Sequence, residues 1–184
     1  MTRKRVLPVI CGLWSVVFIF CGCGYTTRSG IASKYQTIYV TPFVNKIDIT
    51  QEGDAAAKYK LYRPQIETDV TKRVTDRFLF DGNLKPVPEG NADVVLKGEV
   101  TAFRKEPVRY EANNEDVAEY RISIVINMNL WNRKDDKLEW EENGFSGEWS
   151  YFTSGSQSIP ESQAVNDALD DLARRVVERA VEQW

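Results

Sequence analysis

Residues 94–103 read VVLKGEVTAF and residues 120–130 read YRISIVINMNL. In both stretches apolar side chains occupy every second position, the pattern of a β-strand with one buried face. The residues between them, 107–118, are polar and acidic and place Asn113-Asn114 at the predicted turn. We therefore expect two long neighbouring strands, each with an apolar and a polar face.

A further long strand is expected over residues 138–151, where the alternation changes phase. Leu138 and Trp140 have one parity, whereas Phe145, Trp149 and Tyr151 have the other. A β-bulge at Asn143-Gly144 would restore the register and keep one face apolar. Shorter strands are expected at residues 35–43, where Pro42 indicates an edge or a strand end, and at residues 84–87.

Two segments have helical periodicity. The first has an apolar residue at every fourth position, with Pro64 at its first turn and Gly82 at its end: Ile66, Val70, Val74 and Phe78. The second begins at Pro160-Glu161 and continues as a wide apolar stripe. The predicted fold is an α+β two-layer sandwich, with two helices packed on one face of a mixed four- to five-stranded sheet.

The composition excludes several kinds of catalytic site. The 184 residues include no histidine, so Ser-His and Cys-His nucleophile pairs and histidine-ligated zinc are excluded. The three cysteines are Cys11, Cys21 and Cys23, and none follows them in the chain. We expect no enzymatic activity, no cofactor and no metal.

The N-terminal residues are typical of an export signal. Three cations at residues 3–5 precede Val6–Phe20, an uncharged run of 15 residues that is short for a membrane span. The following Gly22-Cys23-Gly24 looks like a bacterial lipobox. We expect a lipoprotein signal peptide at 1–22, lipidation of Cys23, a lipidated tether at 23–34 and one domain at 35–184. The residue after the cysteine is not Asp, which by the lipoprotein sorting rule favours the outer membrane.

Three alternatives remain for this region. Lipidation could fall on Cys21, the segment could be an ordinary signal peptide, or it could be a retained membrane anchor. Removing the signal peptide leaves 21 cations against 27 carboxylates, a net charge of about −6. Because phosphate backbones attract basic surfaces, a nucleic-acid partner is not expected.

Carboxylates are the remaining candidates for acid–base chemistry. Glu139 and Glu141 would share one face of a strand, close enough for one to raise the pKa of the other. We nevertheless interpret this pair as a solvated outer edge of the sheet, together with Glu142, Glu148 and the acidic residues of the last helix: Asp167, Asp170, Asp171 and Glu178. The predicted polar sheet face is a better candidate for binding, and the alternative is an ordinary solvated sheet face with a few amphipathic side chains. Strand parity and strand ends assign to it Lys97, Phe103, Lys105, Arg121, Trp131 and Arg133.

The order of several short motifs resembles one family. Cys23-Gly24-Tyr25 is followed by IYVTPFVN at 38–45, ADVVLKGEV at 92–100, EYRI at 119–122 and LEWE at 138–141. Together with the alanine-bearing last helix, they resemble the lipopolysaccharide-assembly lipoprotein family LptE over nearly all of the mature chain.

The resemblance implies a binding role without catalysis. Members of the family plug the outer-membrane barrel LptD, support its assembly and bind lipopolysaccharide, and they pack two helices on a sheet of about four strands. The expected partners are thus an LptD-like barrel, lipopolysaccharide and a membrane reached through the lipid anchor. The alternatives are a lipid-anchored scaffold subunit of another envelope complex and, least favoured, a carboxylate-based envelope hydrolase.

Overall fold

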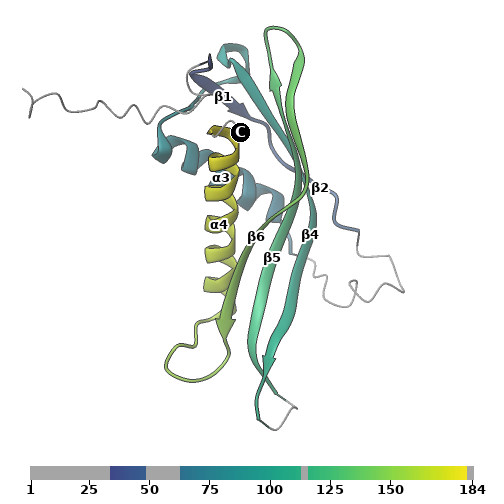
Figure 1. Ribbon diagram of the computed structural model, residues 1–184, viewed down its shortest axis with the longest axis vertical. Coiled ribbons are helices and arrows are strands. Elements are labelled where there is room, and N and C mark those ends of the chain that lie inside the picture. Colours follow the sequence, from purple (N-terminus) through teal and green to yellow (C-terminus); the bar gives the residue numbers. More distant parts are fainter. Residues whose placement is uncertain (1–33, 49–62, 113–115, 182–184) are drawn as a thin grey trace, which may run out of the picture.

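The computed structural model describes residues 34–48, 63–112 and 116–181. In these ranges two helices cover one face of a mixed sheet, as predicted (Figure 1). The elements are β1 (Thr37–Val40), β2 (Val44–Asn45), α3 (Ile66–Asp81), β3 (Lys85–Pro86), the 3-10 helix η2 (Glu89–Asn91), β4 (Val94–Tyr110), β5 (Val117–Asn132), β6 (Lys137–Phe152) and α4 (Glu161–Val181).

The sheet has the strand order β3-β1-β4-β5-β6, and β2 also pairs with β4. β1 is parallel to β3 and β4, whereas β4, β5 and β6 form an antiparallel meander. The described sheet therefore has six strands, one more than the pattern suggested. The extra strand arises because Pro42 interrupts residues 35–43, so that β2 forms beyond it on the same side of β4.

Two glycines of the sheet allow the groups that cover it to approach closely. The ring of Phe43 lies over Gly98, where an added Cβ would come within 2.1 Å of a ring carbon. An added Cβ on Gly147 of β6 would lie 2.4 Å from Leu172 Cβ of α4. Only glycine leaves room for these contacts, so both positions set the distance between the sheet and the groups that cover it.

Each helix follows its sequence pattern. α3 begins two residues after Pro64 and buries the predicted stripe of Ile66, Val70, Val74 and Phe78. It ends at Gly82, whose φ of 77° is the left-handed conformation expected at a helix end. α4 begins at Glu161, directly after Pro160, and packs against β5, β6 and α3.

The β4–β5 hairpin is longer than the sequence suggested. We expected a polar connection from Pro107 to Ala118, but the strands continue to Tyr110 and resume at Val117. The ion pair between Arg109 and Glu119, 3.1 Å long, joins the two strands in this polar part. Interactions between polar side chains on the two strands therefore extend the hairpin beyond its apolar part.

Three of the five register shifts in the long strands decide which way the side chains of the candidate residues point. The predicted bulge at Asn143-Gly144 is confirmed: the register shifts there, and Gly144 has a φ of 71°. A second shift, at Glu139, places Leu138 opposite Trp131 and away from Trp140. A third places Thr101 as an extra residue in β4, and its hydroxyl donates to the carbonyl of Val125 over 3.2 Å.

The predictions for residues 1–33 lie outside the described residues. They comprise the signal peptide, the lipidation of Cys23, the alternative at Cys21 and most of the tether, and they stay predictions. Within the described ranges, no helix combines the length and apolar character that a membrane crossing requires.

Candidate functional site

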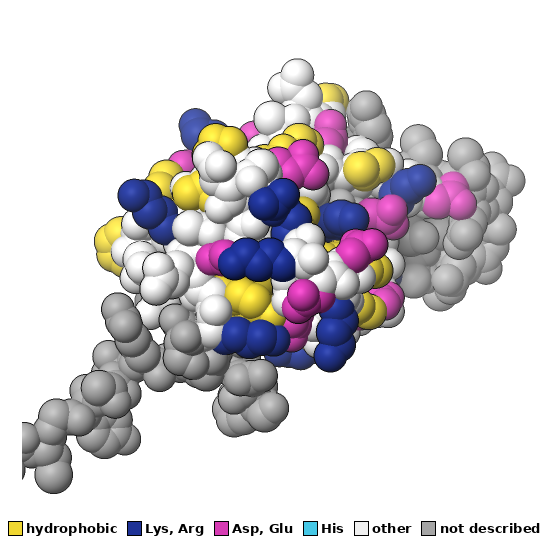
Figure 2. All heavy atoms as spheres, turned by 90° about the horizontal axis from the view of Figure 1, so that it is seen from above, with side chains coloured by type: hydrophobic (Ala, Val, Ile, Leu, Met, Phe, Trp, Pro, Cys, Tyr) yellow, Lys and Arg dark blue, Asp and Glu magenta, His cyan; other side chains and the backbone are white. Residues whose placement is uncertain are grey.

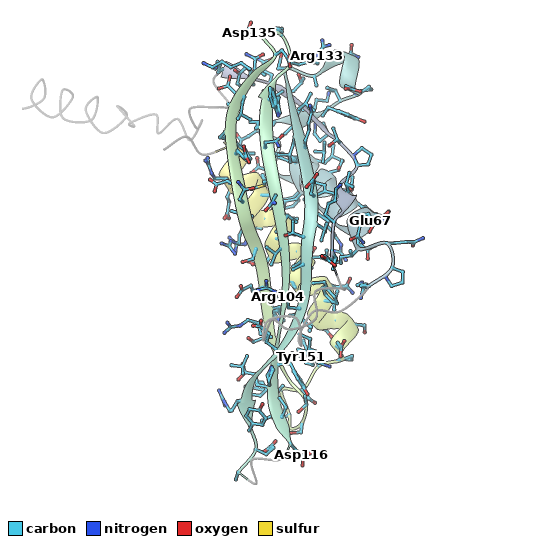
Figure 3. All side chains as sticks on the ribbon, turned by 90° about the vertical axis from the view of Figure 1, so that its right-hand side faces the viewer. Glu67, Arg104, Asp116, Arg133, Asp135 and Tyr151 are labelled. Carbon is cyan, nitrogen blue, oxygen red and sulfur yellow. The ribbon has the colours of Figure 1, made fainter. Side chains whose placement is uncertain are left out.

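The side of the sheet away from the helices is the candidate site, and we call it the open face (Figure 3). Strand pairing brings together on it side chains from β4, β5 and β6 in rows across the sheet. They are mostly amides, carboxylates and cations: Lys97, Glu99, Arg104, Glu106, Arg121, Ser123, Asn127, Asn129, Trp131, Glu141, Asn143, Ser146 and Glu148. The open face is thus a polar surface on a rigid sheet.

A groove of about 550 Å³ lies on this face where β2 and the turn before it rise beside β4. Its lining combines one cation, two carboxylates and several hydrogen-bonding neutral groups: Thr41, Pro42, Val44, Lys97, Gly98, Glu99, Asn127, Met128, Asn129, Glu141 and Asn143. This mixture of donors and acceptors suits a polyhydroxylated ligand better than a purely anionic one.

Two of the predicted residues meet at the groove. Lys97 Nζ lies 5.2 Å from the ring centroid of Trp131, within the range of a cation–π contact. The indole nitrogen of Trp131 donates to Asn129 Oδ1 over 2.8 Å. The indole is therefore held in place beside the groove, while the Lys97 ammonium stays exposed.

The other two predicted cations on this side are separate from that pair. Arg121 lies further along β5, where its Nε is 3.8 Å from Glu148 Oε2. Arg133 lies just beyond the end of β5, in the turn before β6, and its Nε donates to the carbonyl of Ala92 over 2.8 Å. Figure 3 shows Arg133 at one end of the sheet. It holds the turn and does not reach the groove lining.

The structure corrects the face assignment of Phe103 and Lys105. Phe103 is only 3% exposed and belongs to the core under the helices. Lys105 lies 2.6 Å from Glu161 at the start of α4 and 4.4 Å from the centroid of the Tyr120 ring. The extra residue at Thr101 reverses the alternation of β4 beyond it, so strict parity fails there.

Lys105 accordingly has a structural role. Burial alone would lower the pKa of this ammonium, but hydrogen bonds with Glu161 and Tyr151 outweigh it, and the pKa is raised. The charged form of Lys105 thus ties the hairpin to the first turn of α4.

The extra residue at Thr101 also places on the open face a side chain that strand parity had assigned to the core. Arg104 takes the place on the open face that parity gave to Lys105, opposite Ser123 (Figure 3). Its Nε is buried and lacks a hydrogen-bond partner among the described residues. The asparagines 127 and 129 were also missed, although their alternation with Ile126 and Met128 was a usable signal.

Strand parity placed Glu139 and Glu141 on one face, but the structure separates them. The register shift turns Glu139 toward the buried Tyr35, whose hydroxyl donates to it, and toward Lys34 at 3.0 Å. Glu141 instead lines the groove and accepts a 3.0 Å hydrogen bond from Asn143. The hydrogen bond from Tyr35 lowers the pKa of Glu139 despite burial, the opposite of the shift expected from a carboxylate pair.

Most of the acidic residues singled out on α4 are engaged in ion pairs. Asp170 binds Arg73 of α3 over 2.7 Å, and Arg174 joins Asp171 and Glu178 within its own helix. Within the described ranges, no three or more Cys, Asp or Glu side chains gather where they could hold a metal ion. Among the described residues, the open face therefore stays the better candidate for a binding site.

The comparisons give one family and a set of similar folds. Among curated proteins, no match to this chain is found. The solution structure of uncharacterized lipoprotein B from Nitrosomonas europaea is similar with a TM-score of 0.51 and 9% identity, covering 80% of this chain and 83% of that chain. A crystal structure of a Xanthomonas campestris protein has a TM-score of 0.50 and 14% identity, covering 78% and 81%. At these identities the likeness shows a shared fold.

The family model described as "LptE: Lipopolysaccharide-assembly" matches residues 35–184. That range begins at Tyr35, two residues before β1, and includes every element of the sheet and both helices. This chain therefore belongs to the lipopolysaccharide-assembly family LptE.

Proposed function

We propose that this protein is an outer-membrane lipoprotein that supports lipopolysaccharide assembly by occupying an LptD-like barrel and contacting lipopolysaccharide on its open face. The observation that carries the proposal is the family match over the whole domain from residue 35 to residue 184. The signal peptide and Cys23 supply the export and the lipid anchor, and the anchored domain faces the periplasm. The role is one of binding, without catalysis.

The chemistry of the open face suits a phosphorylated glycolipid. Lys97, Arg104 and Arg121 can donate to phosphate oxygens. The amides of Asn127 and Asn129 in and beside the groove can exchange hydrogen bonds with sugar hydroxyls. The Trp131 indole adds an apolar plane beside these donors. Phe103 and Lys105 take no part in this proposal because both lie on the helix-covered side.

The barrel contact is tested by purification from gently solubilised outer membranes. The full-length chain carries a C-terminal tag, and crosslinking in the intact membrane precedes solubilisation. We expect a large β-barrel protein to co-purify in a fixed ratio. Recovery of a free monomer, with no barrel attached and none crosslinked, would contradict the plug.

Lipopolysaccharide contact is tested separately with purified protein. The variant Lys97→Glu/Arg121→Glu reverses two charges on the open face, and we expect its affinity for lipopolysaccharide to fall by about tenfold or more, because two charge-assisted contacts become repulsive. The matched control is Lys72→Glu/Lys85→Glu, which makes the same charge change at exposed positions on α3 and β3. Equal affinities for the two double variants would eliminate the open-face site and leave a nonspecific charge effect.

A further inference from the structure

The C-terminal end of α3 exposes two large apolar side chains. Leu79 is 61% exposed and Phe80 is 81% exposed, the two largest values among the large hydrophobic residues of the described ranges. Both lie off the buried stripe of α3, which ends at Phe78. Neither packs in the hydrophobic core, so folding of the domain does not account for an adjacent leucine and phenylalanine in water.

This pair lies at the end of the domain where the tether begins. Five residues after Phe80, the backbone N–H of Lys85 donates to the carbonyl of Gln36 over 2.9 Å. β3 runs parallel to β1 with Thr37 opposite Lys85, so the end of α3 and the start of β1 share one end of the molecule (Figure 1). The end of β4 at Tyr110 and the start of β5 at Val117 lie at the opposite end.

Two clusters fix the root of the tether to the domain. Asp93 accepts hydrogen bonds from the backbone N–H groups of Gln36 and Thr37, at 3.1 and 3.2 Å. Glu139 accepts a hydrogen bond from the hydroxyl of Tyr35 and forms an ion pair with Lys34. The position at which the chain leaves the domain is therefore set at Lys34, within the same end as Leu79 and Phe80.

The distance from that root to the lipid is limited. Cys23 precedes Lys34 by eleven residues, and a fully extended chain spans at most about 3.6 Å per residue, or roughly 40 Å here. A lipidated Cys23 thus keeps this end of the domain at high effective concentration beside the membrane surface. Under that condition a weak apolar contact is enough to orient the domain.

We infer that Leu79 and Phe80 insert into the lipid surface that carries the anchor and so orient the domain with this end toward the membrane. The inference rests on the lipid anchor of the proposed function. Phenylalanine and leucine are the side chains that interfacial contacts bury at the boundary of headgroups and acyl chains. Arg77, whose guanidinium carbon is 5.3 Å from the centroid of the Phe80 ring, can remain at headgroup level beside the inserted ring.

The charges at this end favour insertion over electrostatic adsorption. Figure 2 looks onto this end and shows Lys and Arg side chains interspersed with Asp and Glu. Asp81 and Lys85 flank the pair in the same mixed manner. Because neither sign dominates, the contact should persist on zwitterionic lipid and at raised salt.

The experiment uses the full-length lipidated protein with one environment-sensitive fluorophore. Once Cys23 is lipidated and the signal peptide removed, the mature chain has no other cysteine, so Phe80→Cys provides a single labelling site. The matched control is Val108→Cys on the hairpin, where the native side chain is 44% exposed. Each labelled protein is reconstituted on vesicles of phosphatidylethanolamine and phosphatidylglycerol, or of phosphatidylcholine alone, with or without lipids brominated in the acyl chain.

We expect the label at residue 80 to shift to the blue and to be quenched by brominated lipid severalfold more than the label at residue 108, on both vesicle compositions. A second variant carries the label at Leu79→Cys together with Phe80→Ser. We expect it to be quenched much less than the label at residue 80, because neither Leu79 nor Phe80 then remains to enter the bilayer, whereas Phe80→Cys keeps Leu79.

Vesicle flotation separates the two ways of failing. Protein that does not float lacks the anchor and overturns this inference together with that part of the proposed function. Protein that floats while the labels at residues 80 and 108 behave alike overturns the insertion alone. A blue shift that depends on protein concentration and resists brominated lipid would show that a protein, a second copy or a partner, covers the pair, and would also overturn the insertion.

Discussion

The two faces of β5 differ although the same strand builds both. On the side toward the helices, Ile122, Ile124, Ile126, Met128 and Leu130 are almost completely buried. On the other side, cationic, amide and indole side chains alternate with them and remain partly exposed. One strand therefore contributes side chains to the core and to the groove. Substitutions at adjacent positions of β5 should then differ in effect, one lowering stability and the next weakening binding.

The difference separates the face that stabilises the fold from the face that we propose for recognition. On the covered face, α3 and α4 close over aliphatic side chains, so the burial of apolar area stabilises the fold there. On the open face, polar side chains project from a sheet whose geometry is fixed by the helices packed on its other face. The open face can hence vary in sequence without unfolding the domain, and substitutions on the covered face should affect stability first.

The largest contrast is expected between neighbours on β5. Leu130 is fully buried, whereas Trp131 lies on the open face beside Lys97. Leu130→Ala should lower the free energy of unfolding by about 2–5 kcal/mol, since it removes buried methyl groups and leaves a cavity. Trp131→Ala should cost less than about 1 kcal/mol and should weaken lipopolysaccharide binding instead. Urea unfolding of both variants, with binding measured in parallel, tests the contrast; similar losses of stability would contradict it.

A smaller effect is expected where α4 approaches the sheet. In Gly147→Ala the new Cβ would lie within 2.5 Å of both backbone and side-chain atoms of Leu172, so the helix has to move. We expect a loss of about 1–3 kcal/mol of unfolding free energy, as for other overpacked sites.

The matched control is Gly90→Ala in η2, where an added Cβ meets nothing within 4 Å. The control should be neutral or slightly stabilising because alanine restricts the unfolded chain. Thermal denaturation of both variants measures the difference. An unchanged midpoint in Gly147→Ala would show that the spacing of α4 from β6 is not fixed by this glycine.

The sequence predicted the covered face well and the open face less well. Period-four stripes identify α3 and α4, because a helix buries one side along its whole length. Strand parity holds only until a residue is added, and at Thr101 no glycine or proline marks the addition. Gly144 did mark the bulge in β6, and there the prediction was correct. Thus Phe103 and Lys105 were assigned to the wrong face, and Arg104 was missed.

The smallest effect concerns the contact that joins the tether root to the covered side. The hydrogen bond from Tyr35 holds the pKa of Glu139 below its usual value of 4.5. Because the folded-state pKa is the lower one, this stabilisation is present above pH 4.5 and is lost as the pH falls through the folded-state value. A net contribution of about 1 kcal/mol is expected for such a contact.

Glu139→Gln separates this contribution from those of other carboxylates. The glutamine side chain would still accept a hydrogen bond from the Tyr35 hydroxyl but would not titrate. Asp93, whose pKa is lowered chiefly by the hydrogen bond from the N–H of Gln36, titrates in both proteins. The difference in unfolding free energy between the two proteins should therefore shrink as the pH falls below 4.5, and it should be constant between pH 6 and pH 8. A difference that stays constant down to acid pH would mean that the Glu139 charge does not hold Tyr35. The segment at Lys34 would then be held by the hydrogen bonds to Asp93 alone, and the orientation inferred for Leu79 and Phe80 would lose one of its two supports.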